Sequence, residues 1–315
     1  MKDWLNSWGK YLEDPDRNSN YSLNKGDKGW FSDAGMKVLR SQGRIYDEAD
    51  GFIKTYVTKN DNPEGGYGYQ SWDEFFTHKF QPNARPLYIP DDPKLAASLI
   101  HSACESTVLR ISYKVKKHDQ FWLKGQPYSL YDMLDINPGP TGVKRAEQFI
   151  GGTIYQAFLS PQDYHRWHAP VNGTIVDSYV IDGTYYAVIL TQPKVGDHLR
   201  TGDPRGALIR SQPFLTIAAT RAIIFIQADN PLIGLMCFVG LGMCEVSTCE
   251  LSEKVKNKQK VSVGDELGMF HFGGSSHVMV FNNTASITFA DNIVQDTHIK
   301  INSIIAQVHE KPPKV

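Results

Sequence analysis

From about residue 96 to the C-terminus, short apolar or alternating segments are separated by turn residues, a pattern typical of strands. The segments expected to form strands are 108–115, 152–159, 174–181, 185–190, 222–226, 233–239 and 243–250. One helix is expected among them, at 129–134, and Asp182-Gly183 has the chemistry of a hairpin turn. The repetition of strand, turn and strand predicts an α+β fold whose β-rich core is a sandwich or a flattened barrel.

The first ninety residues show a helical period instead. One helical face gathers the apolar residues Trp4, Trp8, Tyr11 and Leu12. Asp33 is expected to cap a second helix, and Ser71 with Glu74 has the spacing of a capping box. Proline and aspartate become frequent just before the first strand-like segments, which marks a boundary. We therefore expect a helical N-terminal region, 1–90, and a β-rich domain, 91–315.

Composition excludes some classes of function. The chain has 33 basic and 34 acidic residues, so a basic surface for nucleic acid is not expected. Its four cysteines show no CxxC spacing, which favours free thiols in a reducing compartment. Charged residues interrupt the first segment where a signal peptide needs an apolar run. The longest uncharged stretch, 231–244, is too short to cross a bilayer, so we expect a soluble, cytoplasmic protein without a transmembrane segment.

The most informative feature lies near the C-terminus. An apolar run, 269–272, stops at Gly273-Gly274-Ser275-Ser276, and a second apolar run, 277–281, follows. The two glycines leave the backbone open to close approach, and the Ser275 hydroxyl lies next to the carbonyl of Gly274. A serine in this place is positioned to attack its own peptide bond. An ordinary Gly/Ser hairpin turn is the alternative that the tetrapeptide leaves open.

A second cluster of reactive side chains occupies residues 163–170. Asp163, His165, Arg166 and His168 lie within it, and Pro170 disfavours a long helix. A histidine that titrates near neutrality is the usual proton carrier for activating a serine or reprotonating a carbanion. Structural roles for His165 and His168 remain open. A zinc site through these two histidines is the metal-based alternative, but HExxH, CxxC and a third ligand at recognisable spacing are missing from the sequence.

Glu105 is a carboxylate inside an apolar, strand-like segment. A buried carboxylate needs a partner, because leaving it uncompensated in a core is costly. Glu105 is a candidate for orienting a histidine that deprotonates Ser275, which would complete a serine, histidine and acid arrangement. The alternative is a structural salt bridge in the core, with Arg110 or Arg166 as its partner.

Several motifs become recognisable together. They are Phe75-Phe76-Thr77 with Asn83-Ala84-Arg85-Pro86, the segment 163–170, and the segment 264–276 that contains Gly273-Gly274-Ser275-Ser276. In order and spacing they resemble the phosphatidylserine decarboxylase family. Ala103-Cys104-Glu105-Ser106 and Ser247-Thr248-Cys249-Glu250 further resemble its soluble branch typified by fungal L-tryptophan decarboxylase. The resemblance covers the chain from about Trp30 to the C-terminus.

The resemblance implies that the chain cleaves itself. In the family a serine attacks the preceding carbonyl, the resulting ester eliminates, and dehydroalanine hydrolyses to a pyruvoyl group. Carried over to this chain, the scissile bond is Gly274–Ser275, giving a β chain of 1–274 and an α chain of 275–315. The pyruvoyl carbonyl would form a Schiff base with the substrate amine and act as an electron sink. Neither pyridoxal phosphate nor a metal is then expected.

The same resemblance implies roles for individual residues. His168 matches the processing base, Glu105 its orienting acid, and His165 a residue that acts in decarboxylation and reprotonation. The supporting residues are Asp163, Gly273 and Ser276.

Glu105 and Gly273 depart from the phospholipid enzymes, which carry Asp and Leu at the matching positions. These departures count against specificity for a lipid. The tryptophan-type motifs, together with the lack of an evident membrane-insertion segment in the sequence, favour a free, aromatic L-amino acid such as tryptophan as the substrate of a pyruvoyl-dependent decarboxylase. Phosphatidylserine is the alternative within the same chemistry, and a non-processing binding protein is the alternative from another class. Dimers are common among relatives, so a homodimer is a further expectation.

Overall fold

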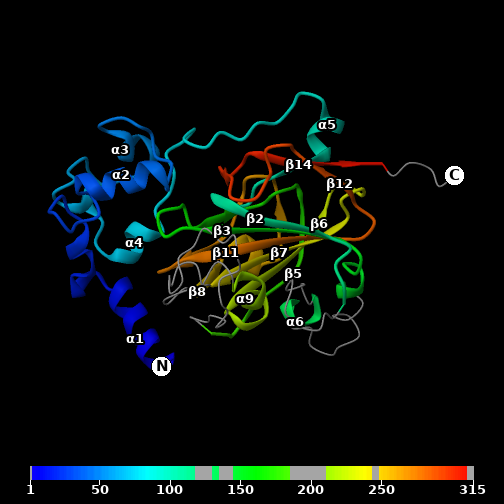
Figure 1. The fold of residues 1–315 in the computed structure, drawn as a ribbon, viewed down its shortest axis with the longest axis horizontal. Coiled ribbons are helices and arrows are strands. Elements are labelled where there is room, and N and C mark those ends of the chain that lie inside the picture. Colours follow the sequence, from blue (N-terminus) through cyan, green and yellow to red (C-terminus); the bar gives the residue numbers. More distant parts are fainter. Residues whose placement is uncertain (1, 118–129, 135–144, 185–210, 243–247, 311–315) are drawn as a thin grey trace, which may run out of the picture.

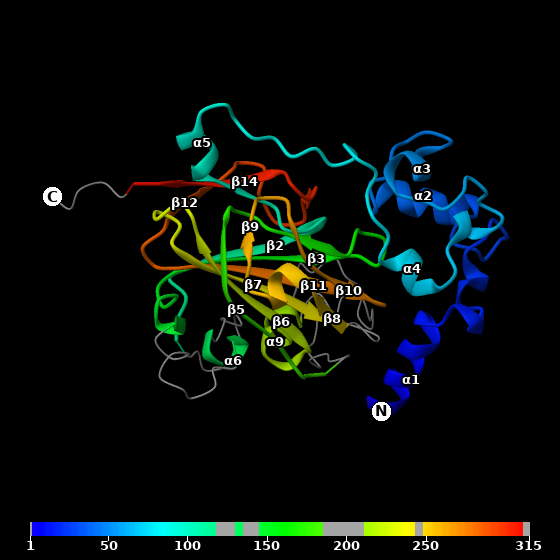
Figure 2. The same ribbon diagram turned by 180° about the vertical axis from the view of Figure 1, so that it is seen from behind.

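A computed structural model describes residues 2–117, 130–134, 145–184, 211–242 and 248–310 of the 315-residue chain. The α-helices are α1 (Lys2–Glu13), α2 (Asp33–Ser41), α3 (Gly51–Thr55), α4 (Trp72–Phe76), α5 (Pro93–Ser98), α6 (Leu130–Leu134), α9 (Gln212–Ala218) and α10 (Glu253–Lys256), with short 3-10 turns at Pro15–Arg17, Ser19–Ser22 and Gly66–Gly68. In Figures 1 and 2, α1 to α4 gather at one end of the β-rich body. An extended segment then runs along that body to α5.

Local chemistry explains where two of these helices begin. Ser71 caps α4, because its side chain accepts a hydrogen bond from the amide of Glu74. The predicted capping box is only half formed, since the Glu74 carboxylate accepts from Gln70 instead of Ser71. The prediction for α2 was wrong by one residue: Ser32 is the cap and bonds the amide of Gly35, while Asp33 is the first helical residue.

Three antiparallel sheets form the β-rich body. The largest has eight strands in the order β13-β2-β3-β11-β7-β6-β5-β9. Their bounds are β2 (Ser106–Tyr113), β3 (Thr153–Leu159), β5 (Gly173–Ile181), β6 (Arg221–Ala228), β7 (Leu235–Gly242), β9 (Lys260–Val261), β11 (Ser275–Phe281) and β13 (His298–Ile299). The smaller sheets have the orders β1-β14-β12 and β4-β10-β8, with β1 (Leu99–His101), β14 (Ile304–His309), β12 (Ser286–Phe289), β4 (Arg166–His168), β10 (Glu266–His271) and β8 (Thr248–Leu251).

The α+β class predicted from the sequence is confirmed, but within the described residues the large sheet does not close into a barrel. Most predicted strands match observed ones within a few residues, and the predicted helix at 129–134 corresponds to α6. The predicted strand 185–190, residues 243–247 of the predicted strand 243–250, and the second half of the 182–183 hairpin lie outside the described residues. The expected boundary near residue 90 stays a prediction.

β11 lies in the middle of the large sheet and is buried on both faces. Alternate residues point to opposite faces of a strand. Met279 and Phe281 join the core cluster that contains Trp167, whereas Val278 and Val280 join a second cluster around α6. Since Ser275 shares the face of Met279, its side chain points toward the first cluster.

Candidate active site

The break at 273–276 is a crossing between two sheets. β10 ends at His271 in the β4-β10-β8 sheet, and β11 begins at Ser275 in the large sheet. These strands do not pair with one another, so the hairpin alternative is wrong. Ser275 is paired on both sides, with Leu159 of β3 and Gly242 of β7. The bond after Gly274 is therefore held firmly on its C-terminal side.

The Ser275 hydroxyl faces a histidine. Its Oγ lies 3.2 Å from Nδ1 of His165, and both residues are buried. The imidazole stacks on Phe76, with 3.9 Å between ring centroids, and Phe270 meets it edge-on. Burial lowers the pKa of His165 to about 3, with a smaller contribution from His78. A neutral imidazole at this distance can accept the serine proton.

The neighbouring serine is engaged elsewhere. Ser276 points to the opposite face of β11, and its hydroxyl donates to the carbonyl of Ala157 at 2.9 Å. The amide of Gln156 lies 3.4 Å from the same hydroxyl. Of the two serines after the glycines, Ser275 is the one that faces a base.

His168 is held by two other groups. Its Nδ1 lies 3.1 Å from Oδ1 of Asn302, and its Nε2 lies 3.3 Å from the hydroxyl of Tyr164. The Asn302 amide nitrogen donates to the carbonyl of Arg85, so Oδ1 is the acceptor and Nδ1 of His168 carries the proton. Burial lowers the pKa of His168 as well. In the described residues the histidine at hydrogen-bonding distance from Ser275 is thus His165.

Glu105 is fully buried and forms an ion pair with Arg85. The guanidinium donates to both carboxylate oxygens, at 3.0 and 2.9 Å from Nε and 2.7 Å from Nη2. The amide of Ile301 donates to the same carboxylate at 2.9 Å. Arg166, one of the two partners suggested from the sequence, pairs with Glu266 instead. Glu105 is connected to His168 only indirectly here, through the carbonyl of Arg85 and the Asn302 side chain.

Asp163 stabilises the turn that leads to His165. Its carboxylate accepts from Nε2 of His298 at 3.0 Å and from the amide of Ser160 at 2.7 Å. Burial raises the pKa of Asp163 to about 6, against the opposing effect of His298. Sequence reasoning missed His298 and Asn302, because both lie more than a hundred residues from the side chains they hold.

Sequence reasoning also missed His277. It lies on the same face of β11 as Ser275, fully buried between the rings of Tyr155 and Phe238. Neither ring nitrogen has a hydrogen-bond partner among the residues that the structure describes. Burial lowers the pKa of His277 to about 3, so the ring is neutral. The only sequence signal was its position two residues after Ser275.

Because these histidines are buried in their neutral form, we expect the folded protein to lose stability as the pH falls. Burial lowers the pKa of His78 to about 4 and of His165 and His277 to about 3, so the unfolded chain binds protons first as the pH falls. Each histidine should cost about 2 kcal/mol of stability between about pH 7 and pH 5, and protonation of Asp163 should return about 1 kcal/mol. We expect the free energy of unfolding, measured with urea, to fall across this range, and less steeply in His277→Phe. A pH-independent free energy of unfolding would contradict these burials.

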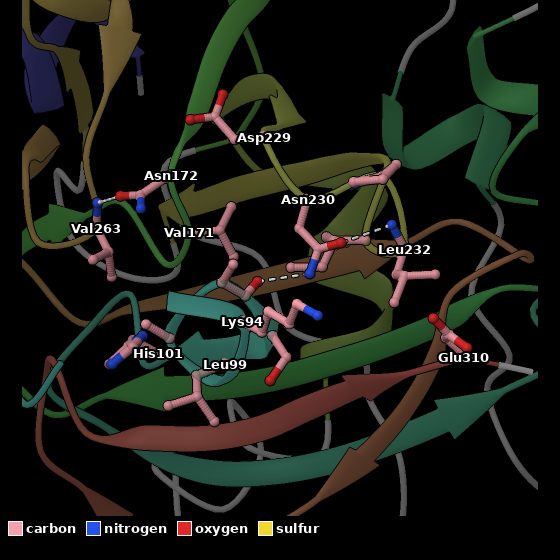
Figure 3. Close-up of a pocket in the computed structure, with 15 residues that line it drawn as sticks. Lys94, Leu99, His101, Val171, Asn172, Asp229, Asn230, Leu232, Val263 and Glu310 are labelled. Carbon is pink, nitrogen blue, oxygen red and sulfur yellow. Dashed lines mark hydrogen bonds between the residues drawn. The ribbon is translucent and has the colours of Figure 1, made fainter. Parts of the chain in front are cut away.

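A cavity of about 540 Å³ lies away from this site. Figure 3 shows that Leu99, Val171, Leu232 and other side chains line it, and that Asn230 bonds a backbone carbonyl within it. Its wall includes the connection between β6 and β7, whereas Ser275 pairs with the opposite end of β7. The cavity is therefore not the space in front of the reactive serine.

Over the described parts of the chain, no group of three or more His, Cys, Asp or Glu side chains is placed to hold a metal ion. Among those same residues, no helix has the length and apolar character needed to cross a bilayer.

The chain matches a known protein family over most of its length. A family model described as phosphatidylserine decarboxylase matches residues 72–307, and a second model of these decarboxylases matches residues 1–39. The chain belongs to the phosphatidylserine decarboxylase family. It is therefore a carboxy-lyase of this pyruvoyl-dependent family, and the resemblance inferred from the separated motifs is confirmed.

Three individual proteins are similar to this chain over most of its length. The chain is 50% identical over 312 residues to "Decarboxylase iboD" of Amanita muscaria, covering 98% of this chain and 84% of that protein. It is 34% identical over 317 residues to "L-tryptophan decarboxylase" of Psilocybe cubensis, covering 97% of this chain and 67% of that one. "Phosphatidylserine decarboxylase proenzyme 3" of Schizosaccharomyces pombe is 29% identical over 283 residues, 85% of this chain and 26% of that protein.

Proposed function

We propose that this chain is a self-processing, pyruvoyl-dependent decarboxylase of a free L-amino acid, with an aromatic, tryptophan-like side chain favoured. The observation that carries the proposal is the Ser275 hydroxyl, buried 3.2 Å from a neutral imidazole directly after two glycines. The choice of a free amino acid is supported by the similarity to two proteins named L-tryptophan decarboxylase, each 34% identical over nearly the whole chain.

In the proposed processing reaction, His165 Nδ1 accepts the Ser275 hydroxyl proton as Oγ bonds to the carbonyl carbon of Gly274. The peptide C–N bond then breaks, the proton passes to the departing amine, and an ester remains. Loss of the Cα proton of residue 275 expels Gly274 as a free carboxylate and leaves dehydroalanine. Water replaces the nitrogen, which departs as ammonia, and the chain from 275 onward then begins with a pyruvoyl group.

The surrounding residues fit such a group. Residue 275 begins a strand that is paired on both sides, so the new chain end is held in place after cleavage. Phe76 and Phe270 exclude water from the face that His165 occupies. A pyruvoyl carbonyl at this position would be the electrophile for the substrate amine, and it would accept the electron pair that remains on the substrate when carbon dioxide departs. His165 is placed to return a proton to the reacting carbon, and neutral His277 lies on the same face.

Two measurements test the proposal on the purified, unmutated protein. Intact-mass spectrometry is expected to show two pieces, 1–274 and 275–315, and Ser275→Ala is the uncut control. Carbon dioxide release is expected from L-tryptophan, within a panel of free amino acids, and not from phosphatidylserine liposomes. Turnover of the lipid alone would reverse the substrate assignment. An intact 315-residue product without turnover would favour a binding protein. The cytoplasmic location and the homodimer stay predictions.

A further inference from the structure

We infer that the N-terminal helices brace a strained turn immediately before the Gly274–Ser275 bond, and that Leu12, Asp73, His271 and Phe272 are thereby positioning residues for self-processing. The inference rests on the proposed function, because it concerns the same cleavage. On this inference the N-terminal helices contribute to self-processing in addition to burying apolar surface.

The strain is visible in the backbone. Phe272 has a φ of 72°, in the left-handed region where a bulky side chain is an outlier. The amide of Gly273 donates to the carbonyl of His271 at 3.1 Å, which closes a hydrogen-bonded turn around this one residue. A turn of this kind with positive φ at its central residue is rare and strained. Strained backbone of this sort persists only where the surroundings hold it, and it gathers at functional sites.

The first element that holds the turn is apolar. The side chain of Phe272 is 5% exposed and packs against Leu12 of α1, which is 4% exposed. Leu5, Tyr11 and Trp72 cover this pair, so the contact is made by α1 and α4. Within the part of the chain that the structure describes, Leu12, Leu5, Tyr11 and Trp72 are the apolar side chains grouped with Phe272, in a cluster separate from the main cores.

The second element is ionic. Nδ1 of His271 lies 2.9 and 3.0 Å from the two carboxylate oxygens of Asp73 on α4. Nε2 lies 3.1 Å from the carboxylate of Glu250 on β8. An imidazole between two carboxylates donates at both nitrogens, which is the charged form. Burial opposes that form, but the bonds to Asp73 and Glu250 outweigh it and raise the pKa of His271.

These contacts fix the scissile bond from both directions. Upstream, the brace formed by α1, α4 and β8 holds His271 and Phe272. Downstream, both neighbouring strands hold Ser275. Only Gly273 and Gly274 lie between the two anchors, so the Gly274 carbonyl has little freedom to move away from the serine hydroxyl. Cleavage frees the upstream end, and the turn at Phe272 can then relax, which favours the cut product.

The test follows processing in time. Full-length chains are made by cell-free translation with labelled methionine, and gels give the half-time for conversion of the precursor into the pieces 1–274 and 275–315. Leu12→Ala and Asp73→Asn are expected to lengthen this half-time about ten-fold, because small displacements of reacting groups are costly. The controls on α2 are Leu39→Ala, which truncates an equally buried leucine, and Asp33→Asn, which removes an exposed carboxylate, and both are expected to stay within about two-fold of the unmutated chain.

Further measurements separate positioning from general destabilisation. Thermal melting of each variant on the Ser275→Ala background shows whether the precursor folds, and Leu39→Ala is expected to lower the melting temperature at least as much as Leu12→Ala. Once cleaved, Leu12→Ala is expected to release carbon dioxide at the unmutated rate. Unchanged half-times in Leu12→Ala and Asp73→Asn, or equal slowing by Leu39→Ala, would overturn the inference alone. An unmutated chain that never cleaves would overturn the proposed function as well.

Discussion

Replacing His165 with alanine is expected to leave the chain as an uncut precursor that releases no carbon dioxide. The Ser275 hydroxyl then has no base at 3.2 Å, and a positioned general base is worth about 10²- to 10⁴-fold in rate. Without cleavage residue 275 remains a serine, so the electrophile for the substrate amine does not form. The half-time of precursor conversion, read from gels of cell-free translation products, measures the effect.

His168→Ala is the matched control, because it removes the same kind of ring from the same segment. His168 bonds Asn302 and Tyr164, so its loss is expected to slow cleavage less than the loss of His165. The family resemblance gives the base role to His168 instead. If His168→Ala blocks cleavage while His165→Ala cleaves normally, His165 is not the base, and the precursor must rearrange before it reacts.

Local sequence patterns predicted the elements of the fold but not their partners. β3 and β5 were recognisable because short alternating or apolar runs ended at turn residues. The pairing of β10 and β11 was not, since a two-glycine break looks the same whether the strands form a hairpin or enter separate sheets. Which strands pair depends on how distant parts of the chain pack together, and the local periodicity of a segment contains no information about that.

In the site, too, the sequence indicated the reactive residues but not their arrangement in space. The glycine pair indicated Ser275, and two histidines within four residues indicated a proton carrier. Which histidine faces the serine depends on how the segment enters β4, where His165 lies just before the first strand residue and His168 is the last. The partner of Glu105 depends on the path of the chain between α4 and β1, because Arg85 lies in that connection and pairs with Glu105. Such placements follow from tertiary packing.

Removing either member of the buried ion pair between Arg85 and Glu105 is expected to cost about 3–5 kcal/mol of folding free energy. The Glu105 side chain is fully buried and that of Arg85 is 3% exposed, so either single substitution strands a charge in the core. Arg85→Met leaves the carboxylate with the Ile301 amide alone, and Glu105→Leu leaves the guanidinium with backbone carbonyls. Urea unfolding on the Ser275→Ala background measures the loss without interference from cleavage.

The double variant, Arg85→Met with Glu105→Leu, tests why the single variants lose stability. The cause is either one charge left unpaired in the core or the loss of a strong attraction between the two charges. Desolvation consumes most of the Coulombic gain of a buried pair, so an apolar replacement of both partners is expected to recover most of the stability lost in the singles. The exposed pair between Lys256 and Glu253 serves as the comparison, and Lys256→Ala there should lower the stability far less than either single variant in the core. Single variants at Arg85 and Glu105 that unfold like the parent would mean that water reaches this carboxylate. Glu105 would then be free to change partners during processing and to contact His168 directly, as the sequence suggested.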